Sequence, residues 1–229
     1  MSVFKLPLGI CDDIQKVISR FWWSSNAEKR GIHWARWESL SQAKQKGGLG
    51  FRDFASFNQA LVAKQGWRIL QFPDSMVSKI LQARYFKNCH FLNAKLGFRP
   101  SFIWRSILWG REVINRGIRW RIGRGDQVEI YRGNWMSRPL TFKLVSLPSL
   151  PIDVTVSELI DDDNQWKVGL IYQHFVKEDA DTITRIPLAR QPTADQVLWH
   201  FDKKGNYNVK SRYQVALRIT LEDSRGCSN

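Results

Sequence analysis

The sequence predicts a mainly helical protein of the α+β class with two small β-hairpins. Apolar residues recur every three or four positions through residues 1–117, and the period changes to two from residue 118 onwards. The 229 residues are 43% apolar, which is enough to bury a core without disulfides. We therefore expect a basic helical region at 1–117, a hairpin at 118–136, a proline-rich connector at 137–153 and a small α+β region at 154–229.

The first predicted helix begins after Pro7 and Gly9. Asp12 and Asp13 lie near its positive end, where acidic side chains are favourable. A polar loop with one or two helical turns, HWARWESL, follows it. The apolar positions of the helix are spaced by three and four and form one stripe: Ile10, Ile14, Val17, Ile18, Phe21 and Trp22.

The segment KQKGGLGFRDF predicts a tight turn followed by a second helix over residues 54–71. Gly47 and Gly48 permit positive φ and a close approach of the backbone. In the helix, Lys64 and Arg68 are four residues apart and share one face. A different face is marked by larger apolar residues: Phe54, Phe57, Leu61 and Trp67.

Two further helices are predicted in the first region. One runs from Asp74 to about Phe86, because PDSM supplies a start signal. The other follows Pro100 and Ser101 and ends at Gly117. The apolar stripe of the first of these helices contains Met76, Val77, Ile80, Leu81 and Tyr85.

The two hairpins are predicted from alternation with a period of two. In GIRWRIGRGDQVEIYRGNW, apolar residues alternate with arginines before a GRGD turn, and Val128 and Ile130 alternate with polar residues after it. Near the end of the chain, DQVLWHF and NYNVKS flank the turn DKKG. Short helices are expected around VSELI and in QWKVGLIYQHFVKED, and a last helix begins at SRYQ. The three prolines of residues 137–153 predict an extended connector.

The charge is strongly asymmetric along the chain. Residues 1–140 hold 24 Lys and Arg against 9 Asp and Glu, whereas residues 141–229 hold 11 against 12. A basic surface attracts polyanions and releases condensed counterions when it binds phosphates. Nucleic acid is therefore the leading partner class and an anionic membrane surface is the second. A basic but inert solvated surface is the remaining alternative.

The candidate contacts to nucleic acid are cations that flank the glycine turn or lie on regular elements. They are Lys44, Lys46, Arg52, Lys64, Arg68, Arg119, Arg121 and Arg124, and the turn itself contains Gly47, Gly48 and Gly50. For Arg52 the alternative is an ion pair with Asp53 or Glu38. For the three arginines of the hairpin, the alternative is a solvated polar face.

No constellation of catalytic or metal-binding residues is found, and we expect no catalysis, no metal and no cofactor. GGLG lacks the Lys-Ser/Thr of a phosphate-binding loop, and the run 161–163 is typical of solvated acidic residues. An enzyme would need carboxylates such as Asp53, Asp126 and Glu129 to converge on one pocket. The three cysteines are too scattered for a disulfide framework and indicate a reducing compartment. No apolar run approaches the length of a membrane span.

Four segments resemble the region that follows the polymerase core in plant non-LTR (LINE-type) retrotransposon reverse transcriptases. They are residues 21–70, beginning FWWSSN; residues 73–86, PDSMVSKILQARYF; residues 102–125, beginning FIWRSILWG; and residues 197–213, beginning VLWHF. The residues that match the family's thumb-like motif are Gly47, Gly48, Gly50, Arg52, Phe57, Lys64, Trp67 and Arg68.

The resemblance implies a fragment of a larger RNA-directed DNA polymerase. A thumb grips the template–primer duplex, so the implied partners are RNA, DNA or a hybrid duplex, together with other parts of a reverse transcriptase. The YxDD-type palm motif that precedes this region in the family and the Cys/His cluster that follows it do not occur in this sequence. The expected location is intracellular, in the nucleus or an organelle.

We thus expect a non-catalytic fragment that grips backbone phosphates through a basic helical surface. The alternative is a retroelement-derived relic or a protein-interaction module. In that case, an exposed aromatic face in residues 1–70 would replace contacts with a missing polymerase core, and the protein would tend to self-associate.

Overall fold

A computed structural model of the protein gives the fold. Among the described residues, no helix is long and apolar enough to cross a membrane. The residues that the structure describes are 2–24, 34–42, 44, 47–138, 141–189, 193–202, 205 and 207–226.

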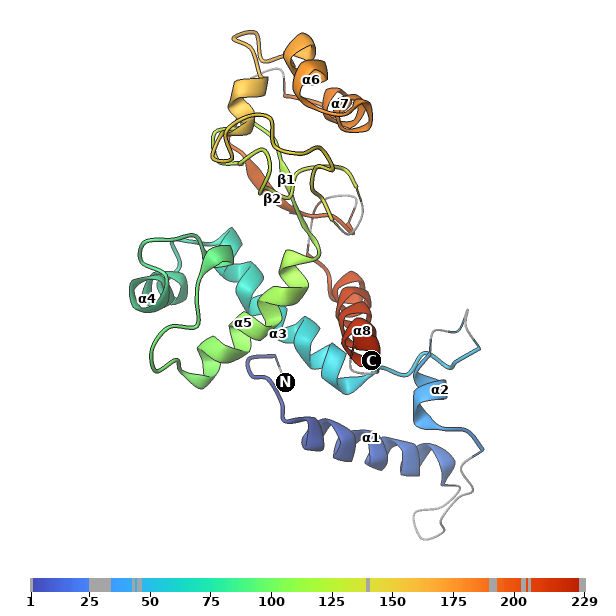
Figure 1. The fold of residues 1–229 in the computed structure, drawn as a ribbon. Coiled ribbons are helices and arrows are strands. Elements are labelled where there is room, and N and C mark those ends of the chain that lie inside the picture. Colours follow the sequence, from blue (N-terminus) through green and yellow to red (C-terminus); the bar gives the residue numbers. More distant parts are fainter. Residues whose placement is uncertain are drawn as a thin grey trace. The chain divides into compact units, whose positions relative to one another are not determined.

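The chain forms two compact units (Figure 1). The first unit consists of residues 1–115 together with 208–229, and the second consists of residues 116–207. The described residues are mainly helical with one two-stranded antiparallel sheet, which confirms the predicted α+β class.

The first unit is built around one central helix. Figure 1 shows α3 in contact with α5, and α8 and α1 also pack against α3. The elements of the unit, in chain order, are α1 (Leu8–Trp23), α2 (Trp37–Ser41), α3 (Phe54–Gln71), α4 (Met76–Tyr85), the 3₁₀ turn η2 (Phe91–Asn93), α5 (Phe102–Asn115) and α8 (Val209–Gly226).

Helix α3 begins at a side-chain cap, because the carboxylate of Asp53 accepts a hydrogen bond from the backbone N–H of Ser56 at 2.7 Å. The helix ends within one residue of the predicted position, but its buried face differs from the prediction. The predicted aromatic stripe is only half-buried, and small or polar residues fill the interior instead. The buried residues are Ser56, Asn58, Gln59, Ala60, Val62, Ala63, Gly66 and Ile69.

The small residues of α3 allow α5 to approach closely. A Cβ atom added at Gly110 of α5 would lie 2.7 Å from the backbone nitrogen of Ala63 and 2.9 Å from its Cα. Gly66 of α3 is similarly crowded by Ile114 of α5. Because helix separation depends on the side chains at the contact, the pair needs a glycine at position 110.

The predicted apolar faces of α1 and α4 are largely exposed. On α1, Val17 and Phe21 are 61% and 82% exposed, and on α4 Met76 and Val77 are 77% and 64% exposed. The apolar stripes of these two helices therefore contribute little to the core of the unit. The helices form as predicted, but α4 has only Ser78 buried, whose hydroxyl donates a hydrogen bond to the carbonyl of Phe72.

The second unit contains the sheet, in which β1 pairs antiparallel with β2, with Ile118 opposite Trp199 and Arg121 opposite Gln196. The first predicted hairpin is thus wrong, because the strands at 118–121 and 196–199 pair with each other. In the second predicted hairpin, the first strand is β2, residues 209–211 belong to α8, and residues 203, 204 and 206 lie outside the described residues. The elements of this unit are β1 (Ile118–Arg121), the 3₁₀ turn η3 (Val156–Leu159), α6 (Val168–His174), α7 (Lys177–Thr184) and β2 (Gln196–Trp199).

Asp195 provides the physical reason that the first hairpin does not form. Its buried carboxylate accepts hydrogen bonds from the backbone N–H groups of Gly123, Gly125 and Gln127 at 2.6, 2.9 and 3.0 Å. These donors are therefore not available to a local strand partner. The segment after β1 curls around this carboxylate, and β2 takes the place of the predicted second strand.

The proline-rich segment 137–153 lies within the second unit. Phe142 is fully buried, and Leu144 and Leu150 pack against the hydrophobic core, which includes Trp135 and Ile171. The segment thus contributes to the packing of the unit.

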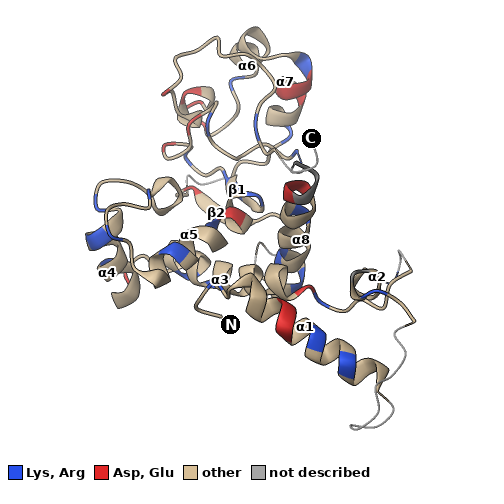
Figure 2. Ribbon diagram, turned by 60° about the horizontal axis from the view of Figure 1, so that its bottom comes forward, with Lys and Arg blue, Asp and Glu red and all other residues tan. Residues whose placement is uncertain are grey.

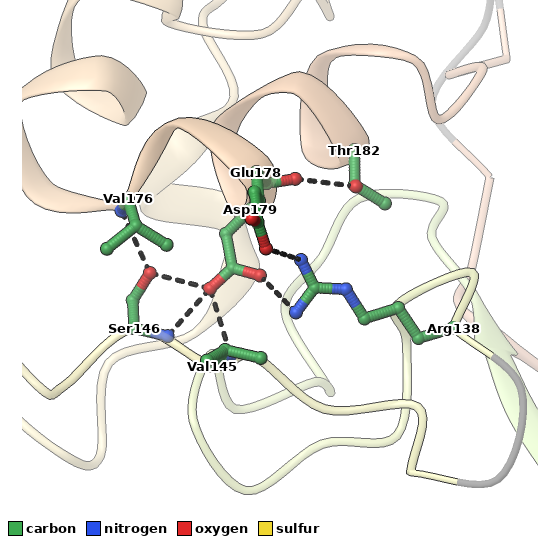
Figure 3. A network of polar contacts seen from close by, with 7 residues as sticks. All are labelled: Arg138, Val145, Ser146, Val176, Glu178, Asp179 and Thr182. Atoms are coloured by element: carbon green, nitrogen blue, oxygen red, sulfur yellow. Dashed lines mark hydrogen bonds and ion pairs between the residues drawn. The ribbon is translucent and has the colours of Figure 1, made fainter.

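A buried ion pair ties this segment to α7 (Figure 3). Arg138 approaches one oxygen of Asp179 at 2.8 Å. The other oxygen accepts hydrogen bonds from the backbone N–H groups of Val145 and Ser146 at 2.9 and 2.7 Å and from the hydroxyl of Ser146 at 2.6 Å. That hydroxyl also accepts from the N–H of Val176 at 3.0 Å, just before α7 begins. The Asp179 side chain is fully buried, so every contact is shielded from water.

Candidate nucleic-acid interface

The positive charge of the chain resides in the first unit. Residues 1–115 and 208–229 hold 22 Lys and Arg against 9 Asp and Glu, a net charge of +13, whereas residues 116–207 hold 13 against 12. Figure 2 shows Lys and Arg on several helices of the first unit, including α1, α4, α5 and α8. The cations are thus distributed over several helices and are not confined to one.

The glycine turn before α3 requires its glycines. Gly47 and Gly50 have φ values of 83° and 76°, in the left-handed region that favours glycine. A Cβ atom at Gly48 would overlap the carbonyl oxygen of Gln42. Lys44 is exposed beside this turn. Lys46 lies outside the described residues.

Arg52 is exposed, and its guanidinium lies over the ring of Phe57 at 4.4 Å from the centroid. The alternative of an ion pair with Asp53 is not observed, because that carboxylate caps α3. The side chain of Glu38 lies outside the described part of the structure. Stacking on an aromatic face holds the guanidinium in place and leaves its N–H groups available to an anion.

Lys64 and Arg68 are both exposed on α3. Their spacing of four residues places them on the same helical face, one turn apart. Arg52 precedes the N-cap residue Asp53 and therefore lies before α3 and not on it. Of the three cations, Lys64 and Arg68 lie on the helix, and Arg52 lies in the segment that leads into it.

A groove between α1 and the α2 region is a second basic feature of this unit, which the sequence analysis did not identify. It has a volume of about 770 Å³, and its lining includes Lys16 and Arg20 from α1 and Arg36 before α2. The indoles of Trp34 and Trp37 also line it, and Trp34 is 80% exposed. The only signal in the sequence was the proximity of tryptophans to cations, because the groove itself depends on how residues 34–37 lie relative to α1.

The three arginines of the first predicted hairpin do not all lie at one site in the second unit. Arg119 and Arg121 line one pocket together with Arg185, a residue that the sequence analysis missed. Arg124 lies outside this pocket and forms an ion pair with Asp126 at 3.5 Å. Burial lowers the pKa of Arg119 from its usual value. The pKa of His200 is also lowered, first by burial and then by the nearby charge of Arg119.

The carboxylates considered for an enzymatic pocket each have a local partner. Asp53 caps α3, Asp126 pairs with Arg124, and Glu129 pairs with Arg132 at 3.5 Å. Within the described ranges, no group of three or more His, Cys, Asp or Glu side chains is placed to hold a metal ion.

Comparison with curated proteins finds two relatives in Arabidopsis thaliana. The chain is 42% identical over 137 residues to "Uncharacterized mitochondrial protein AtMg00310", and the matched region covers 59% of this chain and 89% of that protein. It is 30% identical over 224 residues to "Putative ribonuclease H protein At1g65750", and the matched region covers 94% of this chain and 36% of that protein. The chain thus spans about a third of the length of the second relative. Neither a protein-family profile nor a solved structure matches it.

Proposed function

The chain belongs to the family of the mitochondrial protein AtMg00310 of Arabidopsis thaliana, and on this premise we propose that it is a retroelement-derived protein that binds nucleic acid without catalysing a reaction. The second relative is named for ribonuclease H, and this is consistent with an origin in a retroelement. The first relative is named as a mitochondrial protein, and this favours an organelle over the nucleus as the location of this chain.

The net charge of +13 on the first unit carries this proposal. The exposed cations on α3 and the basic groove beside α1 offer contacts to phosphates, which carry no sequence information. Exposed Trp34 adds an aromatic face that any unpaired base can stack on. The ligand proposed is therefore RNA, DNA or a hybrid duplex, gripped as a thumb grips template and primer, with little sequence preference.

Binding is expected to weaken steeply with salt, because each neutralised phosphate releases a counterion. Replacing both Lys64 and Arg68 with alanine removes two phosphate contacts. It should reduce the slope of log K against log salt by about 2. Fluorescence anisotropy of a labelled hybrid duplex between about 50 and 200 mM salt measures this slope.

The matched control is the double substitution Lys143→Ala and Lys177→Ala, which removes the same charge from exposed positions in the second unit. It should leave the slope unchanged. A flat salt response of the unsubstituted protein, or equal slopes for all three proteins, would contradict the proposal. The labelled hybrid should remain intact when it is incubated with the protein and Mg²⁺.

A second candidate function, that of a protein-interaction module, is favoured by the exposed apolar face of α1. Ile10, Val17 and Phe21 are spaced by seven and four residues, and all three are exposed. Such a face is typical of a surface that packs against another protein. In this case the partner is another part of a longer protein or a second copy of the chain.

If this face mediates association, the weight-average mass in sedimentation equilibrium should rise with protein concentration. The double substitution Val17→Ser and Phe21→Ser should abolish that rise, because it removes the exposed apolar surface. Leu147→Ser is the control, since it removes an exposed leucine of the second unit. A constant monomer mass for the unsubstituted protein would argue against self-association.

A further inference from the structure

The second unit contains a pocket lined by Arg119, Arg121 and Arg185, and these arginines are not part of the basic helices of the first unit. It lies entirely in the second unit and has a volume of about 460 Å³, within the range of small-ligand sites. Arg119 and Arg121 are two residues apart on β1, so they project from the same face of the strand. Arg185 follows α7 at its C-cap position.

The positive charge of this pocket is not compensated by any carboxylate in its lining. None of the three arginines forms an ion pair within the described part of the second unit. The carboxyl end of α7 supplies only a partial negative charge. Cations that line a common cavity repel one another, and a bound anion would relieve that repulsion.

Arg119 is the most constrained of the three. Its Nη1 donates a hydrogen bond to the hydroxyl of Ser137 at 2.8 Å, which also lines the pocket. Its Nε is buried and has no hydrogen-bond partner among the described residues. A buried donor without an acceptor costs free energy, so a ligand that supplies an oxygen there gains an interaction that water does not replace.

Apart from Ser137 and Thr182, the rest of the lining is apolar or aromatic. Leu198 is half-buried and lies opposite Arg119 in the sheet, so it shares the face of the arginines. Trp120 alternates with them on β1 and packs against the hydrophobic core. The buried Trp135 also lines the pocket, and its indole N–H is bonded to the carbonyl of Ile130 at 2.9 Å. An indole and aliphatic side chains suit a flat, weakly polar ring. The guanidinium groups, by contrast, suit the oxygens of a phosphate. One class of small ligand combines a flat, weakly polar ring with a phosphate.

We propose that this pocket binds a phosphorylated nucleoside, with its phosphate among Arg119, Arg121 and Arg185 and its base against the apolar part of the lining, which includes Leu198. The nucleotide comes either from solution or from the phosphorylated end of a strand, and both present the same chemistry. This site is separate from the basic helices of the first unit and does not depend on them.

The test is isothermal titration calorimetry of the full chain with 5′-AMP and with adenosine. 5′-AMP should bind and adenosine should bind at least about tenfold more weakly, because hydrogen bonds to a charged group are lost. Arg121→Gln combined with Arg185→Gln should weaken 5′-AMP binding at least about tenfold. Both side chains are exposed, so the fold should tolerate the change.

Arg132→Gln is the control, because this exposed arginine belongs to the same unit but does not line the pocket. It should leave the affinity for 5′-AMP unchanged. Equal affinity for 5′-AMP and adenosine would overturn the proposal, as would 5′-AMP binding that survives the double substitution.

A competition experiment identifies the source of the nucleotide. If a four-residue oligonucleotide with a 5′-phosphate displaces 5′-AMP and its 5′-hydroxyl form does not, the ligand is a strand end. If neither displaces it, the ligand is a free nucleotide. The Lys64 and Arg68 substitutions should leave 5′-AMP binding unchanged, so failure of duplex binding and failure of this pocket are separate results.

Discussion

Replacing Asp179 with alanine is expected to destabilise the second unit by about 3–5 kcal/mol. The substitution leaves the guanidinium of Arg138, whose side chain is only 23% exposed, without the carboxylate that lies 2.8 Å away. It also removes the acceptor of the two backbone N–H groups in the segment beside α7 (Figure 3). Breaking one side of a buried pair is costly because the remaining charge stays desolvated.

Native-state hydrogen exchange with mass spectrometry measures this effect, because it reports the stability of each unit separately. Peptides from α6 and α7 should lose protection in the Asp179→Ala protein. Asp163→Ala is the control, since Asp163 is exposed, and it should change the free energy of unfolding by less than about 0.5 kcal/mol. Equal protection in the two variants would show that the buried pair does not stabilise the unit.

Gly110→Ala is expected to destabilise the first unit by about 1–3 kcal/mol, as overpacking of a tight interior does. The new methyl group would meet the backbone of α3 at Ala63, and neither helix can move its backbone without disturbing neighbouring contacts. Replacing a helical glycine with alanine otherwise stabilises a protein. A loss of stability in the Gly110→Ala protein would therefore have a steric cause.

Gly9→Ala in α1 is the matched control, because a Cβ atom at that position meets nothing within 4 Å. It should stabilise the helix by about 0.4–1 kcal/mol. Hydrogen exchange of α3 and α5 peptides in the two variants compares the same chemical change in two environments. If Gly110→Ala were as stabilising as Gly9→Ala, the close approach of α3 and α5 would be refuted.

The helices of the first unit could be predicted from the sequence because their signals are local. The prolines and capping residues that bound α1, α3 and α5 act within a few positions of each helix end. Which face is buried could not be predicted equally well. Helix α3 is surrounded by other helices and buries small residues such as Ala60 and Ala63, whereas Val17 and Phe21 in the apolar stripe of α1 are exposed.

The pairing of β1 with β2 could not be predicted, because it joins residues that are far apart in the sequence. A period of two identifies β1 and β2 as strands, but it does not identify their partners. The same limit applies to the candidate sites. The spacing of Lys64 and Arg68 is a local property, but the meeting of Arg119 and Arg185 depends on how α7 packs near β1. Trp34 and Arg20 also share a groove that no local pattern encodes.

The division of the chain between the units also affects the order in which they can be completed during synthesis. Helix α8 belongs to the first unit, where Tyr213 accepts a hydrogen bond from the backbone of Asp53 and Thr220 contacts Ser56. All of residues 116–207 leave the ribosome before α8 does. The second unit can therefore reach its final packing first, while α3 keeps the side that faces α8 uncovered. Until translation reaches α8, the surface of α3 that α8 later covers stays in contact with solvent.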